Sequence, residues 1–397
     1  MRQKKTIQQS EFRFASLIAG KIPPRLSPLL MAQIEIAKTA SGADVKDAMI
    51  CVSRLDQSAV ELLSGAPLRL RRGITRLGLK ITRYLATHPS NQHFWIGNQN
   101  GAIPLEIAHE LARHHGTLRF DNYWQPATLT AETAKILVRH HGTLVFHELN
   151  GLTPEIAAIL STTRHDLRFE CVRRILKPAV AAQLATHPGR LALLLKDLSV
   201  STARALIHHQ GDLSLGHAPI SHAVLEVLQR HQAGLVIEIH KLTLRQARQL
   251  ITHPGGSLHL SGLRTLSVEV ARELAKYQGT LGLAYTNPLT LPIVKVLCRH
   301  TGTLELHYYP KFTTPVLRLL ASKTGDLLIY ETDLSEAGLA ALAEHQGVLK
   351  LKPRTALTET GANGLLQHQG PVEINQPKEM TEKVRKILKM HPSITIK

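Results

Sequence analysis

A period of about 23 residues runs through most of this chain and constrains its fold more than any other feature. The period is marked by a residue, usually glycine, that comes directly before an alternating apolar segment. The clear register positions follow one another at intervals of 22 to 24 residues, with one interval of 26. They are Gly116, Gly142, His165, Gly189, Gly211, Ala233, Gly256, Gly279, Gly302, Gly325, Gly347 and Gly370. Repeats of roughly 20–50 residues are typical of solenoids, propellers and arrays.

The unit that begins at Gly256 shows the structure predicted for one repeat. Leu258 and Leu260 alternate with polar residues, which predicts a short strand with both leucines facing the core. An apolar stripe at helical spacing follows, and Ser267 precedes it as the expected N-cap. The stripe consists of Val270, Ala271, Leu274 and Ala275. Gly279 is expected to end the helix in a left-handed conformation.

No single repeat could bury both its strand and its helix, so neighbouring repeats must stack and share a continuous core. The strands then form a parallel sheet with the helices on its other side. Neighbouring strands lie roughly 4.8 Å apart whereas packed helices need roughly 8–10 Å, so the stack should curve with its strands on the inner side. The sequence therefore predicts an α/β fold, a single curved solenoid of strand-turn-helix repeats with a parallel concave sheet and convex helices.

The recurring frame Leu-x-Leu-x-x-Leu-x-x-Leu-Ser/Thr resembles the leucine-rich repeat family, in particular bacterial arrays of about this period. The resemblance covers roughly residues 66–397, with less regular units at Ala66, Gln92 and Pro392. It implies a scaffold whose concave sheet binds a protein. The chain departs from the family after the strand, where Asn or Cys is usual and this chain carries leucine, as at Leu263.

We expect two parts in the chain. Residues 1–55 do not fit the register and form an irregular basic N-terminal cap, and residues 56–397 form a leucine-rich-repeat-like solenoid of about 15 units. Aromatic residues make up only 4% of the chain and apolar residues 43%, so the core should be aliphatic. The sequence does not indicate an oligomeric state.

Catalytic signatures are not found in the sequence, which lacks a phosphate loop, a dinucleotide-binding glycine pattern, His-Glu-x-x-His and a serine elbow. We therefore expect a non-enzymatic protein without a cofactor. Cys51, Cys171 and Cys298 lie more than a hundred residues apart, which favours a reducing compartment over disulfides or a cysteine metal site. We find no leader-like N-terminus and no apolar run of about 18 residues, so we expect a cytoplasmic protein without a membrane span.

Many of the histidines recur two residues before a register position, where each helix should end. They are His114, His140, His187, His209, His231, His300, His345 and His368. An imidazole at this place can bind a free backbone carbonyl, and its partial positive charge suits the helix C-terminus. Tyr277 and Lys323 take the same place in other repeats, which fits a capping role rather than metal binding. We expect no metal at these histidines.

The residue between the two inward positions of each strand should be exposed on the concave face. This central row is chemically varied, as expected of a surface specific for one partner, although an unconstrained solvated face would also vary. The row reads Arg69, Trp95, Arg119, Val145, Arg168, Ala192, Ser214, Val236, His259, Gly282, Glu305, Leu328, Lys350 and Glu373.

The N-terminal part of this face carries both tryptophans and several arginines, residue types common at binding hot spots. The predicted partner-binding residues are Arg69, Arg71, Arg72, His93, Trp95, Arg119, Asp121, Tyr123, Trp124 and Arg168. A weaker candidate lies further along the chain and consists of His307, Tyr308, Tyr309 and Lys311.

The net charge of +18, from 48 Lys and Arg against 30 Asp and Glu, favours an acidic partner. A protein with an acidic surface is the preferred partner. Nucleic acid is the alternative, with the basic N-terminal half contacting phosphates and Trp95, Tyr123 and Trp124 offering rings for base stacking. Basic terminal repeats would also serve solubility alone.

Overall fold

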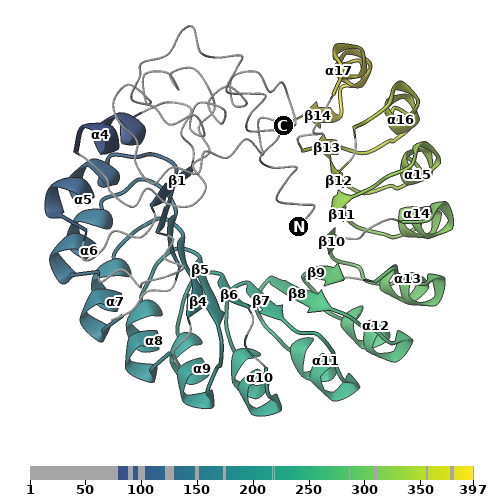
Figure 1. The fold of residues 1–397 in the computed structure, drawn as a ribbon. Helices are drawn as coiled ribbons and strands as arrows, with labels where there is room; N and C mark the ends of the chain where they lie inside the picture. Colours follow the sequence, from purple (N-terminus) through teal and green to yellow (C-terminus); the bar gives the residue numbers. More distant parts are fainter. Residues whose placement is uncertain are drawn as a thin grey trace, which may run out of the picture. The chain divides into compact units, whose positions relative to one another are not determined.

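The computed structural model describes the chain in segments. They are residues 79–87, 93–96, 103–120, 129–147, 152–172, 176–216, 218, 220–285, 287–307, 312–354, 356–375 and 380–396. The chain divides into two compact units, one comprising Met1–Arg173 and Thr186–Ala192, the other Arg174–Ala185 and Leu193–Lys397. In each unit, short helices alternate with short strands (Figure 1).

The described strands of the first unit form a parallel sheet in sequence order. Its elements are α4 (Leu79–Thr87), β1 (His93–Ile96), α5 (Leu105–Ala112), β2 (Thr117–Phe120), α6 (Ala131–Leu137), β3 (Leu144–His147), α7 (Pro154–Leu160) and β4 (Leu167–Val172). Leu118 of β2 pairs with Leu144 of β3, which pairs with Leu167 of β4. Equivalent leucines of successive repeats therefore lie side by side.

The second unit repeats this arrangement, and its strands from β6 to β14 also pair in parallel and in sequence order. The boundary between the units falls within β5 (Leu191–Leu195). The elements of the second unit are α8 (Pro178–Leu184), α9 (Val200–Leu206), β6 (Leu213–Gly216), α10 (His222–Leu228), β7 (Leu235–Glu238), α11 (Leu244–Leu250), β8 (Ser257–Leu263), α12 (Val268–Leu274), β9 (Thr280–Tyr285), α13 (Leu291–Leu297), β10 (Leu304–His307), α14 (Thr314–Ala321), β11 (Leu327–Thr332), α15 (Glu336–Leu342), β12 (Leu349–Pro353), α16 (Glu359–Leu365), β13 (Val372–Ile374), α17 (Glu382–Lys389) and β14 (Ile394–Ile396).

The predicted register is confirmed by the positions of the strands. In seven repeats the strand begins within one residue of the first inward leucine. These leucines are Leu118, Leu144, Leu213, Leu258, Leu281, Leu304 and Leu349. The irregular units at Gln92 and Pro392 form β1 and β14. Residues 1–55 and the strand segment expected after Ala66 lie outside the described residues, whereas the helix of that unit is α4.

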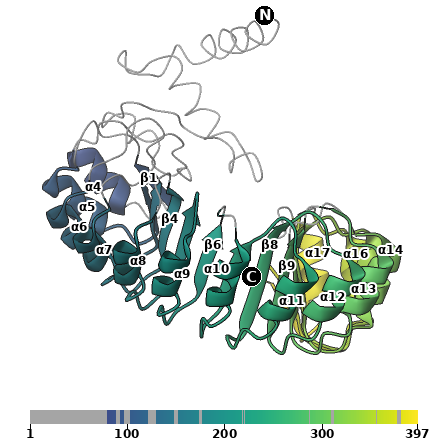
Figure 2. The same cartoon turned by 90° about the horizontal axis from the view of Figure 1, so that it is seen from below.

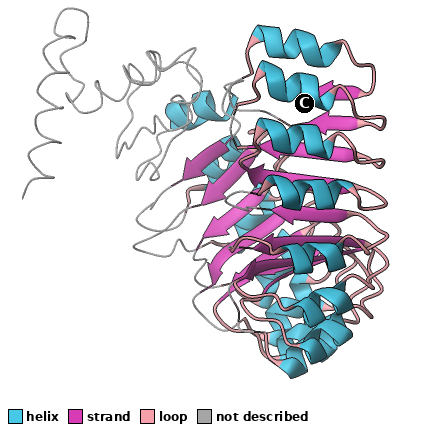
Figure 3. Ribbon diagram, turned by 90° about the vertical axis from the view of Figure 1, so that its right-hand side faces the viewer, coloured by secondary structure: helices cyan, strands magenta, loops and turns pink. Residues whose placement is uncertain are grey.

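The predicted division into strands on one side and helices on the other is confirmed within each unit. In the second unit, α11 to α17 follow one another along the outer side and β8 to β14 along the inner side (Figure 1). Figure 2 shows α11 to α14 of this unit next to one another, and Figure 3 shows its helices packed against one side of the strands. The strand-helix repeat that the leucine-rich repeat resemblance implies is therefore present.

Nine of the described helices begin at a serine or threonine whose side chain caps the first turn. Ser267 accepts a hydrogen bond from the backbone N–H of Val270 at 3.3 Å, as predicted. Thr243 and Gln246 form a reciprocal capping box at the start of α11. Most described helices have seven or eight residues, a length that is not stable alone in water, so they depend on packing against their neighbours. None of the described helices combines the length and the apolar character needed to cross a membrane.

An aliphatic core lies between the strands and the helices. Leu258 and Leu260 of β8 are 0% and 1% exposed, and Leu274 of α12 is 0% exposed. Leu263, which stands where the leucine-rich repeat usually has Asn or Cys, is also completely buried. The turn position that departs from the family therefore contributes to the core of this chain.

The left-handed conformation expected at Gly279 is wrong, because positive φ angles among the described glycines occur only at Gly262 and Gly325. Gly279 is required for a different reason. A Cβ atom at this position would overlap the backbone carbonyl of Gly256, the preceding register residue. That carbonyl also accepts a hydrogen bond from the N–H of Thr280 at 2.8 Å. Glycine therefore allows neighbouring repeats to bring their backbones together.

Replacing Gly279 with alanine should destabilise the protein by about 1–3 kcal/mol, because the added methyl group must displace backbone rather than a flexible side chain. Gly256→Ala is the matched control, since a Cβ there has no atom within 4 Å. We expect that variant to be neutral or slightly stabilised. Urea unfolding of both variants measures the difference, and equal stabilities would contradict the proposed close approach.

Truncating Leu274 should cost about 2–5 kcal/mol of unfolding free energy, because the change leaves a cavity between α12 and the sheet. Leu291, which is 47% exposed at the start of α13, provides the control. Leu291→Ala should change stability by no more than about 0.5 kcal/mol. Denaturant unfolding with far-ultraviolet circular dichroism measures both changes; a loss below about 1 kcal/mol for Leu274→Ala would place this residue outside the core.

Candidate functional site

The parallel register aligns the outward-facing residues of successive strands into a row across the sheet. In the first unit Trp95, Arg119, Val145 and Arg168 are successive partners in this central row. In the second unit the row reads Ser214, Val236, His259, Gly282, Glu305, Leu328, Lys350 and Glu373. The row predicted from the sequence is thus present as a continuous series within each unit.

The expectation that this whole row is exposed is wrong at several of its smaller or apolar members. The buried members are Val145, Ala192, Gly282 and Leu328. Val145 is only 2% exposed because its neighbours in the row are the much longer side chains of Arg119 and Arg168, which lie one strand away on either side. Long polar side chains therefore cover the short apolar ones between them.

The predicted contact residues of the first unit include two arginines that share one carboxylate. Arg119 on β2 forms an ion pair of 2.7 Å with Glu170 on β4, and both side chains are 17% exposed. Arg168 lies 3.7 Å from the other oxygen of Glu170 and is 44% exposed. Arg119 is therefore held across β3, whereas the guanidinium of Arg168 is the more accessible of the two to a partner.

Glu170 was not among the predicted residues. Its signal in the sequence is its position two residues after Arg168, which places both side chains on the same face of one strand. The pair with Arg119 depends on the register between β2 and β4, two repeats apart.

The remaining predicted contact residues are only partly placed by the structure. His93 and Trp95 belong to β1, where Trp95 pairs with Arg119 and His93 with Thr117. Arg69, Arg71, Arg72, Asp121, Tyr123 and Trp124 lie outside the described residues. The structure thus aligns Trp95, Arg119 and Arg168 along one row.

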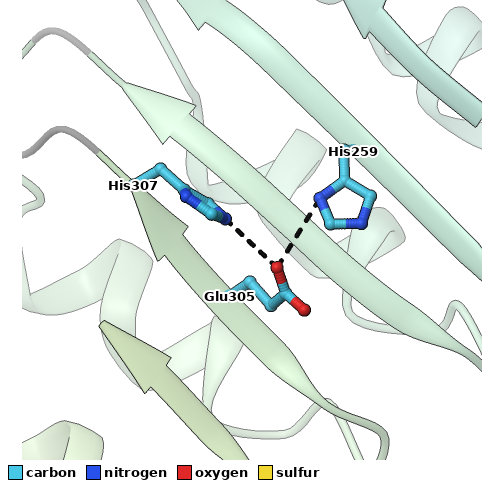
Figure 4. A group of neighbouring side chains, drawn as sticks. All are labelled: His259, Glu305 and His307. Carbon is cyan, nitrogen blue, oxygen red and sulfur yellow. Dashed lines mark hydrogen bonds and ion pairs between the residues drawn. The ribbon is translucent and has the colours of Figure 1, made fainter. Parts of the chain in front are cut away.

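A second cluster of functional groups lies on the strand face of the second unit (Figure 4). His307 Nε2 is 3.1 Å from an Oε2 atom of Glu305, and His259 Nδ1 is 3.8 Å from the same oxygen. The ring of Tyr330 packs beside His307 with centroids 4.9 Å apart. His307 was the first residue of the weaker predicted candidate, whose Tyr308, Tyr309 and Lys311 lie outside the described residues.

The electrostatics of this cluster favour a charged carboxylate. Burial opposes ionisation of Glu305, but the hydrogen bond from His307 and the nearby His259 and Lys350 hold its pKa below the usual value. Burial, together with the charges of Glu305 and Glu373, raises the pKa of Tyr330 to about 12. Tyr330 therefore stays neutral beside an ionised glutamate at physiological pH.

The histidines at the helix ends form a separate column inside the repeats. His140 Nε2 lies 2.8 Å from the carbonyl oxygen of Gly116, and His231 Nε2 lies 3.1 Å from that of Gly211. A carbonyl can only accept, so these ring N–H groups donate. In the same place Lys323 donates to the carbonyl of Gly302 at 2.7 Å. The predicted bonding of helix-end residues to backbone carbonyls is confirmed.

One member of this column was not predicted from the sequence. His253 lies three residues before Gly256, not two, yet its Nε2 is 3.0 Å from the carbonyl oxygen of Ala233. Its ring stacks between those of His231 and Tyr277, at centroid distances of 6.3 and 6.5 Å. The register shifts by one residue in this repeat because two glycines follow one another at its start.

Burial makes the column sensitive to acid. Desolvation lowers the pKa of His140 to about 4, and it also lowers the pKa values of His187, His231, His253, His300, His345 and His368. In the unfolded chain these rings take up protons near the ordinary value of 6.5. The contribution of neutral His140 to stability is therefore complete above pH 6.5 and is lost as the pH falls towards 4, and the other rings with lowered pKa values act in the same direction.

Stability should accordingly decrease between pH 7.5 and pH 5.5, by at most about 1.4 kcal/mol per histidine and pH unit below the unfolded pKa. His140→Gln should reduce this pH dependence because glutamine does not titrate. His141→Gln, at an exposed neighbour, is the control and should keep it. Urea midpoints at the two pH values test the prediction, and an identical pH dependence in all three proteins would contradict it.

No protein-family profile matches the chain. A search of curated proteins found no match. Among solved structures, an internalin from Listeria monocytogenes strain 4b F2365 is similar with 13% identity and a TM-score of 0.31, over 79% of this chain and 88% of that chain. A leucine-rich repeat protein from Leptospira interrogans is similar with 16% identity and a TM-score of 0.32, over 87% of this chain and 99% of that chain.

Proposed function

We propose that this protein is a non-enzymatic binding scaffold that presents its strand face to a protein partner. The observation that carries the proposal is the contrast between the two sides of each strand. The inward side repeats one aliphatic pattern, such as Leu118, Leu144 and Leu167 in successive strands. The outward side changes its chemistry along the sheet, and its longer members, such as Arg168, His259 and Lys350, are accessible to a partner.

Several groups on this face are held in place before a partner arrives. Arg119 is fixed by Glu170, Glu305 by His307, and Lys350 lies 3.5 Å from Glu373. Side chains that are already ordered lose less conformational entropy on binding. A polar surface that is preorganised in this way supports specific recognition more than non-specific attraction.

The proposed partner has an acidic surface. The net charge of the chain is +18, and Arg168 presents a half-exposed guanidinium on the strand face of the first unit. Complementary charge increases association rates and selects partners. The cysteine content favours a reducing compartment, so we place this interaction in the cytoplasm.

Nucleic acid is the second candidate, and the same net charge favours it. The strand face argues against it, because the carboxylate of Glu170 lies 2.7 Å from Arg119 and would repel phosphates, whereas a folded protein surface can present a matching charge to each of the two groups. A phosphate would have to compete with that ion pair. We therefore prefer the protein partner.

Affinity purification of the full chain, with and without nuclease, should recover a partner whose retention does not depend on nucleic acid. With that partner purified, Trp95→Ala and Arg168→Ala should each weaken binding by about 2 kcal/mol or more if these residues are anchors. Arg272→Ala is the control, since Arg272 is exposed on α12 on the helix side. Binding affinities from calorimetry measure these changes.

Two outcomes would contradict the protein-binding proposal. One is equal affinity of the strand-face variants and the Arg272 control. The other is nuclease-sensitive recovery together with affinity for many unrelated nucleic-acid sequences that falls about tenfold or more between low and physiological salt. The second outcome would establish the nucleic-acid alternative.

A further inference from the structure

We propose that His259, Glu305 and His307 form a binding site for one divalent transition-metal ion of the zinc type on the strand face of the second unit. This site is separate from the helix-end histidines, for which the sequence predicts no metal. It also does not depend on the proposed protein-binding function, because its three ligands come from this chain alone.

The three side chains converge because of the sheet register. His259 on β8 aligns with Gly282 on β9, which aligns with Glu305 on β10, and His307 follows two residues later on the same strand and the same face. One ligand atom from each residue lies within 4.8 Å of the others. Among the described residues, this is the group in which three such donors come together.

The distances suit a small ion with nitrogen and oxygen ligands. Ligand atoms about 2.0–2.2 Å from a tetrahedral zinc ion are about 3.3–3.6 Å from one another. The Glu305 oxygen is 3.1 Å from His307 Nε2 and 3.8 Å from His259 Nδ1, one value on each side of that range. The two imidazole nitrogens lie within 4.8 Å of each other, so rotation of these part-exposed rings towards the Glu305 oxygen would bring all three ligands into coordination.

Gly282 creates the space in which the cluster forms. A Cβ atom at this position would overlap Nδ1 and Cγ of the His259 ring. The strand between the ligands therefore carries the one residue type that lets His259 lean across it towards Glu305 (Figure 4). The dependence of the cluster on a residue that is not itself a ligand gives a direct way to test it.

The donor set and its exposure indicate the kind of ion and of site. Two imidazoles and one carboxylate are a common ligand set for zinc sites that keep a fourth position open. The side chains of His259, Glu305 and His307 are 26%, 17% and 25% exposed, so the strand face leaves access for a water molecule or another ligand. Tyr330, packed beside His307, would hold that ring in orientation.

The nearby positive charge does not prevent cation binding. Lys350 is the ammonium group that acts on Glu305, and it lies 3.5 Å from Glu373 in the adjacent strand. Its charge is therefore balanced by a second carboxylate. A surface pair such as His222 and Glu226 on α10 provides only two donors and serves as a comparison.

Titration of Zn²⁺ into the tag-free, chelator-treated full chain should show one saturable site by calorimetry. His259→Ala, Glu305→Gln and His307→Ala should each weaken zinc binding about tenfold or more. Gly282→Ala should have a similar effect without removing a ligand, because the added methyl group displaces His259. Co²⁺ bound at the site should show the intense visible absorption of a four-coordinate ion, and this absorption should disappear in His307→Ala.

Three controls separate this site from non-specific binding by a histidine-rich chain. Ser214→Ala changes a position of the same row on β6, His222→Ala removes a surface histidine that faces a carboxylate, and His140→Gln changes the helix-end column. All three should keep the wild-type zinc affinity, and circular dichroism should show that every variant is folded. Absence of saturable binding, or equal affinity in the four site variants and the controls, would overturn the proposal.

Discussion

The rest of the structure depends on the close approach of neighbouring repeats at the register position. There the backbone carbonyl of one repeat lies against a glycine of the next repeat, as the carbonyl of Gly256 lies against Gly279. The same row of carbonyls accepts hydrogen bonds from the helix-end residues of the following repeat, as Gly116 does from His140. These contacts join each strand-helix unit to its predecessor and bring the leucines into register.

This regular interior leaves the strand face that points away from the helices free to vary in sequence. Inward leucines need only fill space, whereas residues such as Arg119, His259 and Glu305 contribute little to the core and can differ in each repeat. Because the register is constant, a side chain on one strand meets predictable neighbours one or two strands away. Arg119 and Glu170, and likewise His259 and Glu305, therefore interact although they lie 51 and 46 residues apart.

The period in the sequence was sufficient to predict the strands, the helices and the helix-end histidines. The period did not show whether a glycine is needed for a left-handed conformation or for a close backbone contact. Gly279 was expected to be left-handed, but it is needed for the close contact. The period also did not show that long neighbours bury Val145, or that Glu170 pairs with Arg119 and Glu305 with His259 across strands. These features depend on side-chain length and on distances between repeats, which one repeat read alone does not contain.

The short helices allow the repeats to unfold locally. Because no two-turn helix is stable without its neighbours, breaking one interface between repeats exposes only the units on either side, and more distant units keep their own contacts. Opening should then proceed repeat by repeat. A ligand that contacts several strands at once would hold their repeats together and suppress partial opening throughout the segment it covers.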